Sequence, residues 1–227
     1  CFIVLYGDLL LDFNFNKFLA SHHSDSKNDC SIVVHPNNHP YDSDLVETNG
    51  SFVSQFISKP HLPESINFNL VNAAIYCFKK DLILQMRSIF DENEECDFGK
   101  DVFPYLVRNN CMINAYQTSE YIKDIGTPDR YINALSDYRD NKLSKKSLHN
   151  KQKAVFIDRD GTVNIHKGYI TSADQIQIYD DAVNFIQHIN KSDYLIFLIT
   201  NQPQISMGKM SLDDFFLTQK TLETYLG

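Results

Sequence analysis

The stretch KAVFIDRDGTV, residues 153–163, decides the fold of the carboxyl-terminal part of this chain. Its apolar run 154–157 leads directly into Asp158, and a second apolar run, residues 194–199, leads directly into Thr200. Continuous apolar runs of this kind are typical of strands that are buried on both faces of a parallel sheet. Because ligands gather at the carboxyl ends of such strands, we expect Asp158 and Thr200 to share one edge of a sheet.

Two helices are expected around these strands. Residues 181–190 carry apolar side chains three positions apart, which is the spacing of one helix face. Ser211 and Asp214 form a capping-box pattern, which predicts that another helix begins there. The order strand, helix, strand, helix predicts right-handed βαβ units.

The sequence DRDGT, residues 158–162, carries two carboxylates at the predicted strand end. One carboxylate can attack a phosphorus atom while the other moves a proton, and Mg²⁺ would neutralise the phosphate so that the anions can meet. A calcium-binding turn or a solvated loop is the alternative for DRDGT alone, but the second strand-end motif favours a catalytic site. We therefore predict Asp158 and Asp160 as catalytic residues and Mg²⁺ ligands, with Thr200 binding phosphate beside them.

Residues 153–227 resemble the amino-terminal part of a haloacid dehalogenase-like phosphatase, which has a Rossmannoid parallel-sheet fold. The resemblance is closest to the heptose-bisphosphate and histidinol-phosphate phosphatases and rests on three motifs: DRDGTVN (158–164), Gly168-Tyr169 and TNQP (200–203). It implies that Asp158 is the nucleophile that forms an aspartyl-phosphate. It implies that Asp160 is the general acid and then the general base, with its backbone carbonyl on Mg²⁺.

The same resemblance implies roles for the residues around these two. Thr200 would bind the transferring phosphoryl group, and Asn201 and Gln202 would line the substrate side of the site. Lys167 to Tyr169 would form a flap over it. Met207 stands where members usually carry Arg. The Lys and the acidic pair that complete such a site are expected beyond the end of this sequence.

The first part of the chain alternates strand and helix patterns. The predicted strands cover residues 2–6, 30–35, 70–78 and 121–124, and the first of these is expected to be buried. The predicted helices cover residues 13–20, 79–90 and 100–108, and a further helix begins at Thr127-Pro128. Asn49-Gly50, between residues 45–48 and 52–57, predicts a hairpin with a type I′ turn.

Five short motifs follow one another in this first part: Gly7-Asp8, Lys59-Pro60, NAAIY (72–76), DFGKDVFP (97–104) and DIGTP (124–128). Together they resemble the central and carboxyl-terminal parts of sugar-1-phosphate nucleotidylyltransferases, near the mannose- and heptose-1-phosphate guanylyltransferases. Joining a sugar phosphate to a nucleoside triphosphate is phosphoryl transfer, in which two carboxylates can hold Mg²⁺ between them. The resemblance implies that these carboxylates are Asp8 and Asp124. It also implies that Lys59 contacts the sugar phosphate and Asn72 the sugar.

Two positions depart from that family, and one part of it is missing. Ser58 stands where members usually carry Glu, and Ala74 stands where Gly is common. The Gly-rich loop that cradles the triphosphate is expected upstream of Cys1. We therefore predict that the chain holds part of each of two enzymes and that this piece alone is inactive.

The segment SDYRDNKLSKKSLHNKQ, residues 136–152, is polar, basic and almost without apolar side chains. Such a composition buries little surface, so we expect a linker or an exposed helix end there and a domain boundary near Asn150. The predicted fold class is α/β. A partial nucleotidylyltransferase domain with a mixed sheet would cover residues 1–135, and a partial haloacid dehalogenase-like domain with a parallel sheet would cover residues 153–227.

Composition excludes several classes of function. The net charge of −8 argues against electrostatic binding to nucleic acid or to an anionic membrane. No apolar run reaches the roughly 20 residues that a membrane-spanning helix needs. The 16 Phe and 12 Tyr residues are assigned to the core rather than to base stacking.

The cysteines and histidines are not expected to form a site. The five cysteines are widely spaced, which favours unpaired thiols in a reducing cytoplasm: Cys1, Cys30, Cys77, Cys96 and Cys111. Four histidines cluster loosely, at positions where zinc ligands would usually lie closer together: His22, His23, His35 and His39.

Together these predictions describe a cytoplasmic enzyme with two Mg²⁺-dependent activities. A phosphatase would remove the 7-phosphate from heptose 1,7-bisphosphate. A transferase would couple the resulting sugar 1-phosphate to a nucleotide, with GTP as the expected donor, on the way to lipopolysaccharide. A histidinol-phosphate phosphatase is the nearest alternative. A catalytically incomplete relic that binds sugar phosphates or a partner is an alternative of another class, and no oligomeric state is predicted.

Overall fold

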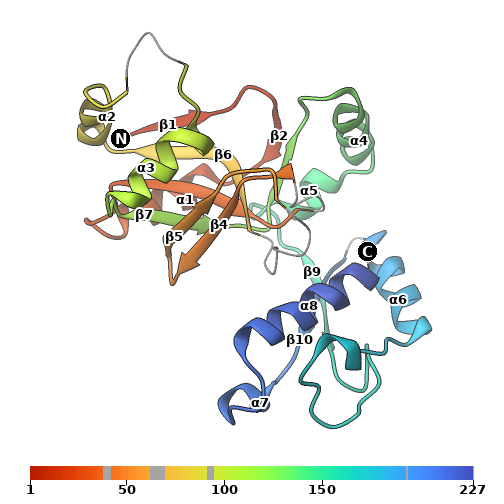
Figure 1. The fold of residues 1–227 in the computed structure, drawn as a ribbon. Helices are drawn as coiled ribbons and strands as arrows, with labels where there is room; N and C mark the ends of the chain where they lie inside the picture. The colour runs from red at the N-terminus through yellow and green to blue at the C-terminus, as the bar shows by residue number, and fades with distance from the viewer. Residues whose placement is uncertain (38–41, 62–69, 91–94, 193, 227) are drawn as a thin grey trace. The chain divides into compact units, whose positions relative to one another are not determined.

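The computed structural model describes residues 1–37, 42–61, 70–90, 95–192 and 194–226. It divides into two compact units, residues 1–150 and residues 151–227, which we call the first unit and the second unit (Figure 1). No helix within the described ranges is long and apolar enough to cross a membrane.

A six-stranded mixed sheet forms the centre of the first unit. Its strands are β1 (Phe2–Leu5), β3 (Cys30–His35), β4 (Leu45–Asn49), β5 (Phe52–Ile57), β6 (Val71–Phe78) and β7 (Ile113–Gln117). Their order in the sheet is β1-β6-β3-β7-β5-β4, and β4 also pairs with β6. β3 and β7 run parallel, while the other pairs are antiparallel. The predicted mixed sheet is therefore confirmed.

Side-chain alternation along β6 builds a core on each face of this sheet. Tyr76 and Phe78 join a buried cluster with α2 (Lys80–Met86) and α3 (Phe103–Arg108). Ile75 joins the opposite cluster with side chains of α1 (Phe15–His23). Because successive residues of a strand point to opposite faces, one apolar strand supplies both clusters.

The strand predicted at residues 2–6 forms, but the prediction that it is buried is wrong. β1 pairs with β6 alone among the described strands. Phe2 and Leu5 are 41% and 48% exposed. An edge strand has a neighbour on one side only, so its apolar composition does not by itself ensure burial.

The predicted hairpin of β4 and β5 also forms, but with a different turn. Asn49 pairs with Phe52, which leaves Gly50 and Ser51 as the two turn residues. Only Gly50 has a positive φ there, at 63°. A type I′ turn needs positive φ at both central residues, so that prediction is wrong.

A separate two-stranded ladder in the first unit joins distant parts of the chain. β2 (Leu9–Asp12) pairs antiparallel with β8 (Tyr121–Asp124), with Leu9 opposite Asp124. The ladder sets Asp8, which precedes β2, beside the end of β8. β8 was predicted from the sequence, whereas β2 was not.

α4 (Pro128–Arg139) begins at the predicted residues. The Thr127 side chain accepts a hydrogen bond from the backbone N–H of Arg130, and Pro128 is the first helical residue. Pro suits this position because its missing N–H would have no partner inside the helix.

The segment 136–152, expected as a linker or an exposed helix end, contains two helical stretches. It contains the end of α4 and all of α5 (Lys142–Lys146). Asp137 is 9% exposed and accepts hydrogen bonds from Tyr121 and Lys123 of β8. These contacts fold the segment into the first unit, which extends to Asn150.

The second unit is built on two parallel strands, β9 (Lys153–Asp158) and β10 (Tyr194–Ile199). The helices α6 (Asp180–Asn190), α7 (Pro203–Ser206) and α8 (Leu212–Leu226) accompany them (Figure 1). α8 begins at the predicted capping box, where the backbone N–H of Asp214 donates to Ser211 Oγ at 3.0 Å.

The two strands of this unit are covered on one face only, among the described residues. Ile157 and Ile196 pack with Leu222 and the other buried side chains of α6 and α8. On the opposite face Phe156 and Phe197 are 68% and 42% exposed, and their rings stack at 5.3 Å. The prediction that both faces are buried is therefore wrong for this pair of strands.

Candidate functional sites

The carboxyl ends of β9 and β10 bring the residues of the second unit's site together. Asp158 is the last residue of β9 and lies opposite Ile199, so Thr200 follows at the same edge. The Asp158 side chain is exposed, whereas Asp160 is half-buried. This edge is the place where ligands bind to parallel sheets.

A tight turn after β9 fixes the position of Asp160. The backbone carbonyl of Arg159 accepts hydrogen bonds from the N–H groups of Val163 and Asn164, at 2.9 and 3.0 Å. Gly161 has a φ of 89° and donates its N–H to the Asn164 carbonyl at 2.7 Å. Only glycine adopts this conformation without strain, which explains its place in the motif.

The Asp160 carboxylate is the most heavily hydrogen-bonded group of this site. Arg159 donates to both of its oxygens, Nε to Oδ1 at 3.1 Å and Nη2 to Oδ2 at 2.9 Å. Asn164 adds a bond to Oδ1 at 3.1 Å, and Gln202 adds one to Oδ2 at 2.6 Å. Burial raises the pKa of Asp160, but these hydrogen bonds outweigh burial and hold it below its usual value.

Gln202 links Asp160 to Thr200. Its amide Nε2 also donates to Thr200 Oγ1 at 2.5 Å. Its own oxygen accepts a hydrogen bond from Gln204, which is buried and donates to the Ile170 carbonyl at 3.0 Å. Gln202, expected to line the substrate side, therefore also positions two other residues of the site.

Arg159 is the functional residue of this edge that the sequence argument missed. It is fully buried and also donates to Gln219 of α8 at 3.1 Å. A buried guanidinium needs an anionic partner, and Asp160 supplies it. Its position between Asp158 and Asp160, directly after an apolar strand, was the available signal, because a cation beside two carboxylates can pair with one of them.

The remaining residues predicted for this site lie at its periphery. The Asn201 side chain is exposed. In the segment 167–169, predicted as a flap, Gly168 has a φ of 77°. Tyr169 is 49% exposed, and the Lys209 ammonium lies 4.9 Å from the centre of its ring.

In the first unit the β2–β8 ladder brings Asp8 and Asp124 together. The Ile125 N–H donates to the Asp8 carbonyl at 2.8 Å. A Cβ atom on Gly126 would lie 3.0 Å from Asp124 Oδ1 and 3.0 Å from Asp8 Oδ2. Both carboxylates therefore face the same glycine, and a side chain at position 126 would crowd them.

Arg130 is a further member of this site that was not predicted. It lies in the first turn of α4 and donates to Asp124 Oδ2 at 2.6 Å. Its other terminal nitrogen donates to Asp42 Oδ2 at 2.8 Å. The Arg130 guanidinium thus bonds to the carboxylates of Asp42 and Asp124 and partly neutralises their negative charge.

Lys59 lies at the end of β5, where neighbouring loops hold the backbone. Its N–H donates to Asp44 Oδ1 at 3.1 Å, while the side chain is exposed. Ser58 Oγ donates to the Gly99 carbonyl at 2.8 Å. A Cβ atom on Gly99 would overlap the Asp44 carboxylate, which would then have to move aside.

Asn72 is held by its own strand and by a tyrosine. Its Oδ1 accepts from the Ala74 N–H, and its Nδ2 donates to Tyr76 Oη, both at 3.0 Å. Ala74 has a φ of 55°. The left-handed conformation costs an L-residue about 1–2 kcal/mol, which explains why Gly is common at this position in the family that the motif resembles.

The negative charges of aspartates from three segments act on the Tyr6 phenol. Burial raises the pKa of Tyr6, and the charge of Asp97 raises it further, with smaller contributions from Asp44 and Asp8. Three carboxylates from separate loops therefore act on one phenol.

Both sites fit Mg²⁺ by their donor chemistry, in different ways. In the first unit, the Asp8 and Asp124 carboxylates converge on a position that lacks a Cβ atom. In the second unit, the oxygens of Asp160 are occupied by hydrogen bonds, so Asp158 offers the exposed carboxylate. Oxygen ligands of this kind are the ones that Mg²⁺ prefers.

A hollow of about 690 Å³ in the first unit lies apart from these residues. It lies between β2 and the helices α4 and α5, and its lining includes Asp12, Tyr138 and Ser144. None of the predicted site residues lines it. We assign it no role.

The cysteines are unpaired, as predicted, and all five are free. His22 and His23 end α1, and His35 ends β3. His39 lies outside the described residues.

Comparison with known proteins finds two kinds of relative. A family model described as nucleotidyl transferase matches residues 1–141. Glucose-1-phosphate adenylyltransferase of Lachnospira eligens is 32% identical over 139 residues, which are 58% of this chain and 31% of that protein. A putative mannose-1-phosphate guanyltransferase of Sulfolobus acidocaldarius is 32% identical over 130 residues, 57% of this chain and 33% of that protein.

The other kind of relative is a phosphatase. The D-glycero-beta-D-manno-heptose-1,7-bisphosphate 7-phosphatase of Pasteurella multocida is 44% identical over 64 residues, 28% of this chain and 35% of that protein. The chain spans about a third of the length of each of these curated relatives.

Proposed function

The chain belongs to the nucleotidyl transferase family, and from this premise we propose that the intact protein combines a sugar-1-phosphate nucleotidylyltransferase with a Mg²⁺-dependent phosphatase. The phosphatase would be haloacid dehalogenase-like and would act on heptose 1,7-bisphosphate. The observation that carries this proposal is the edge of the second unit, where Asp158, Asp160 and Thr200 gather after two parallel strands. Similarity to a curated 7-phosphatase supports the substrate.

The proposed phosphatase reaction has two steps on one face of this edge. An oxygen of the exposed Asp158 carboxylate attacks the phosphorus, and the bond from phosphorus to the sugar oxygen breaks. The sugar oxygen leaves with a proton from Asp160. Asp160 then takes a proton from water, whose oxygen attacks the phosphorus and releases phosphate and free Asp158.

The surroundings of Asp160 suit the second of these steps. Hydrogen bonds from Arg159 and Gln202 stabilise its ionised form, which is the form that accepts a proton from water. Thr200 Oγ1, held by the same Gln202 amide, is positioned to contact a phosphoryl oxygen. Mg²⁺ bound at Asp158 would neutralise charge on the phosphate.

For the first unit we propose that Asp8 and Asp124 hold Mg²⁺ between a sugar 1-phosphate and a nucleoside triphosphate. Lys59, whose exposed side chain lies at the end of β5, would contact the sugar phosphate. Asn72 would contact the sugar. The named relatives include an adenylyltransferase and a guanyltransferase, and we propose GTP as the donor.

The two activities would act in sequence, because the product of the phosphatase is a substrate of the transferase. A cytoplasmic location and a role in supplying activated heptose for lipopolysaccharide belong to the same proposal.

The test uses the intact protein with Mg²⁺ and heptose 1,7-bisphosphate, and it measures released phosphate. Asp158→Asn removes the nucleophile and is expected to lower turnover by at least about 1,000-fold. Asp174→Asn changes an exposed carboxylate of the same unit and serves as the matched control. Unchanged turnover in Asp158→Asn would overturn the proposal.

A panel of substrates separates the alternatives. Faster hydrolysis of histidinol phosphate than of the heptose bisphosphate would favour the histidinol-phosphate phosphatase. No phosphate release from any sugar phosphate by the folded, intact protein would favour the relic.

A further inference from the structure

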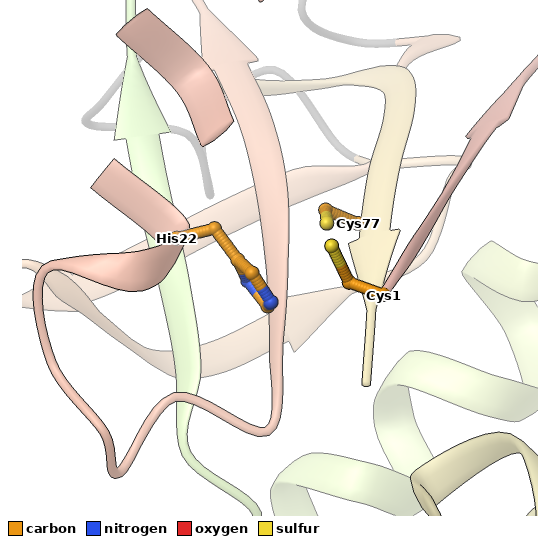
Figure 2. A group of neighbouring side chains, drawn as sticks. All are labelled: Cys1, His22 and Cys77. Atoms are coloured by element: carbon orange, nitrogen blue, oxygen red, sulfur yellow. The ribbon is translucent and has the colours of Figure 1, made fainter. Parts of the chain in front are cut away.

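Two cysteines and a histidine that lie far apart in the sequence meet at one edge of the first unit. Cys1 precedes β1, Cys77 lies on β6, and His22 lies in the last turn of α1. One ligand atom from each of the three residues lies within 4.8 Å of the other two. Figure 2 shows the two sulfur atoms side by side and the His22 imidazole reaching toward them.

Strand pairing and the end of α1 produce this meeting. The register of β1 on β6 sets Ile3 opposite Cys77, which brings Cys1 to the same edge. Cys77 and His22 are buried, at 0% and 2% exposure, whereas Cys1 is exposed. The cluster therefore has two fixed members in the core and one accessible member that can adjust.

The His22 ring is oriented by a neighbour on β3. Its Nδ1 lies 2.8 Å from Ser31 Oγ, and Ser31 is in turn contacted by the Asn114 amide at 3.3 Å. This arrangement leaves Nε2 as the nitrogen for an additional ligand. A hydrogen bond on the other ring nitrogen is the usual support of a histidine that binds metal.

His23 supplies a fourth donor close by. Its Nε2 lies 3.6 Å from Cys1 Sγ. In a tetrahedral zinc site with bonds of about 2.0–2.3 Å, neighbouring ligand atoms lie roughly 3.5 Å apart. The Cys1 and His23 atoms already have that separation. The ligand atoms of Cys1, Cys77 and His22 lie within 4.8 Å of one another and need to approach further, and the His23 side chain, which is outside that group of three, would turn toward them to complete the site.

We propose that Cys1, Cys77, His22 and His23 form a binding site for a thiophilic divalent cation, of which Zn²⁺ is the representative. Two thiols and two imidazoles are the donor set of many structural zinc sites. On binding, each cysteine thiol exchanges its proton for a sulfur–metal bond, so two protons are released and no electron is transferred. The ion would tie the edge strand β1 and β6 to α1.

The site is independent of the proposed activities. None of its four residues belongs to the groups around Asp8 and Asp124 or around Asp158 and Asp160. A cation there would act on the stability of the first unit, because it binds the folded arrangement and not the unfolded chain.

The test titrates the fully reduced chain with Co²⁺, as a spectroscopic substitute for Zn²⁺, in a buffer without thiols. We expect thiolate-to-cobalt absorption that saturates at one ion per chain and disappears when one equivalent of Zn²⁺ is added. Zn²⁺ should also raise the melting temperature of the chain.

Variants decide whether the four residues form the site. Cys1→Ser changes an exposed side chain and should keep the fold, yet weaken Zn²⁺ binding by at least about 100-fold. Cys96→Ser removes another exposed cysteine and should bind as the unaltered chain does. Ser31→Ala leaves every ligand in place and should weaken binding by about 10-fold through the loss of ring support.

Two results would overturn the proposal. One is equal Zn²⁺ affinity in Cys1→Ser and in the unaltered chain. The other is the absence of thiolate-to-cobalt absorption from the folded, fully reduced chain.

Discussion

The two units each place a pair of carboxylates at strand ends, but they treat the carboxylates differently. In the first unit, Asp8 precedes β2 and Asp124 ends β8, and both carboxylates face Gly126. Asp124 accepts hydrogen bonds from the Gly126 N–H and from Arg130, both at 2.6 Å, whereas no described residue donates to the Asp8 carboxylate. In the second unit, Asp158 and Asp160 come from one strand end, and both oxygens of Asp160 are held by Arg159. The first arrangement leaves the Asp8 carboxylate without a donor among the described residues, and the second favours the ionised form of Asp160.

The neighbouring side chains therefore prepare aspartate carboxylates for different chemistry in the two units. A carboxylate without hydrogen-bond donors, such as that of Asp8, remains available to a cation, whereas the donors around Asp160 favour its ionised form, which can accept a proton. Four predictions test the contrast.

The largest effect is expected when one carboxylate pair is altered and the other is left intact. In the intact protein, Asp8→Asn should lower nucleotide transfer by at least about 100-fold, because one of the two proposed Mg²⁺ ligands is lost. The same variant should leave phosphate release unchanged. Asp140→Asn, an exposed carboxylate in the first unit, is the control for both assays. If Asp8→Asn lowered nucleotide transfer and phosphate release equally, the two carboxylate pairs would not act independently.

A smaller effect is expected for a carboxylate that resembles Asp160 in its bonds but serves stability. Tyr121, Lys123 and Lys142 donate to Asp137. Burial raises the pKa of Asp137, but these hydrogen bonds lower it overall from 3.8 to about 2. Asp137→Asn should therefore reduce the free energy of unfolding at pH 7 by about 2 kcal/mol.

The pH dependence of that loss follows from the direction of the shift. The ionised form is stabilised by folding, so the contribution of Asp137 is complete above pH 3.8 and disappears as the pH falls through about 2. Urea unfolding at pH 7 and at pH 3 should show the difference between Asp137→Asn and the unaltered chain shrinking. Asp140→Asn should change stability by less than about 0.5 kcal/mol at either pH. A constant difference would show that Asp137 acts by packing.

The third prediction concerns the hydrogen bond that Gln202 donates to Asp160. Gln202→Met keeps the length of the side chain but removes the donor to Asp160 and Thr200. The pKa of Asp160 should rise toward its usual value, so the acidic limb of the rate profile should move to higher pH. A hydrogen bond to a charged group contributes about 1.5–3 kcal/mol, so phosphate release should fall by about tenfold or more. Gln187→Met, on the exposed side of α6, is the control. An unchanged profile would mean that Gln202 does not set the state of Asp160.

Local signals in the sequence were sufficient for most of the elements. The β-branched run of β3, the apolar runs of β9 and β10 and the Thr127-Pro128 cap are each encoded within a few residues. The edge that carries Asp158 and Thr200 also follows from local patterns, because parallel strands present the same end to one side.

Features that depend on contacts between segments far apart in the sequence could not be predicted from local patterns. β2 is short, and its pairing with β8 is what brings Asp8 to Asp124. Exposure of β1 and of Phe156 depends on which elements lie beside them. The cluster of Cys1, His22 and Cys77 has no local spacing pattern, because three separate elements supply its members.

The fourth prediction tests the account most directly, by identifying the phosphorylated residue during turnover. The intact protein is mixed with heptose 1,7-bisphosphate and Mg²⁺, quenched in acid and analysed by peptide mass spectrometry. We predict one phosphoryl group on Asp158 in the unaltered protein and none in Asp158→Asn. Phosphate release without any phosphorylated Asp158, or with the phosphoryl group on another residue, would contradict the account.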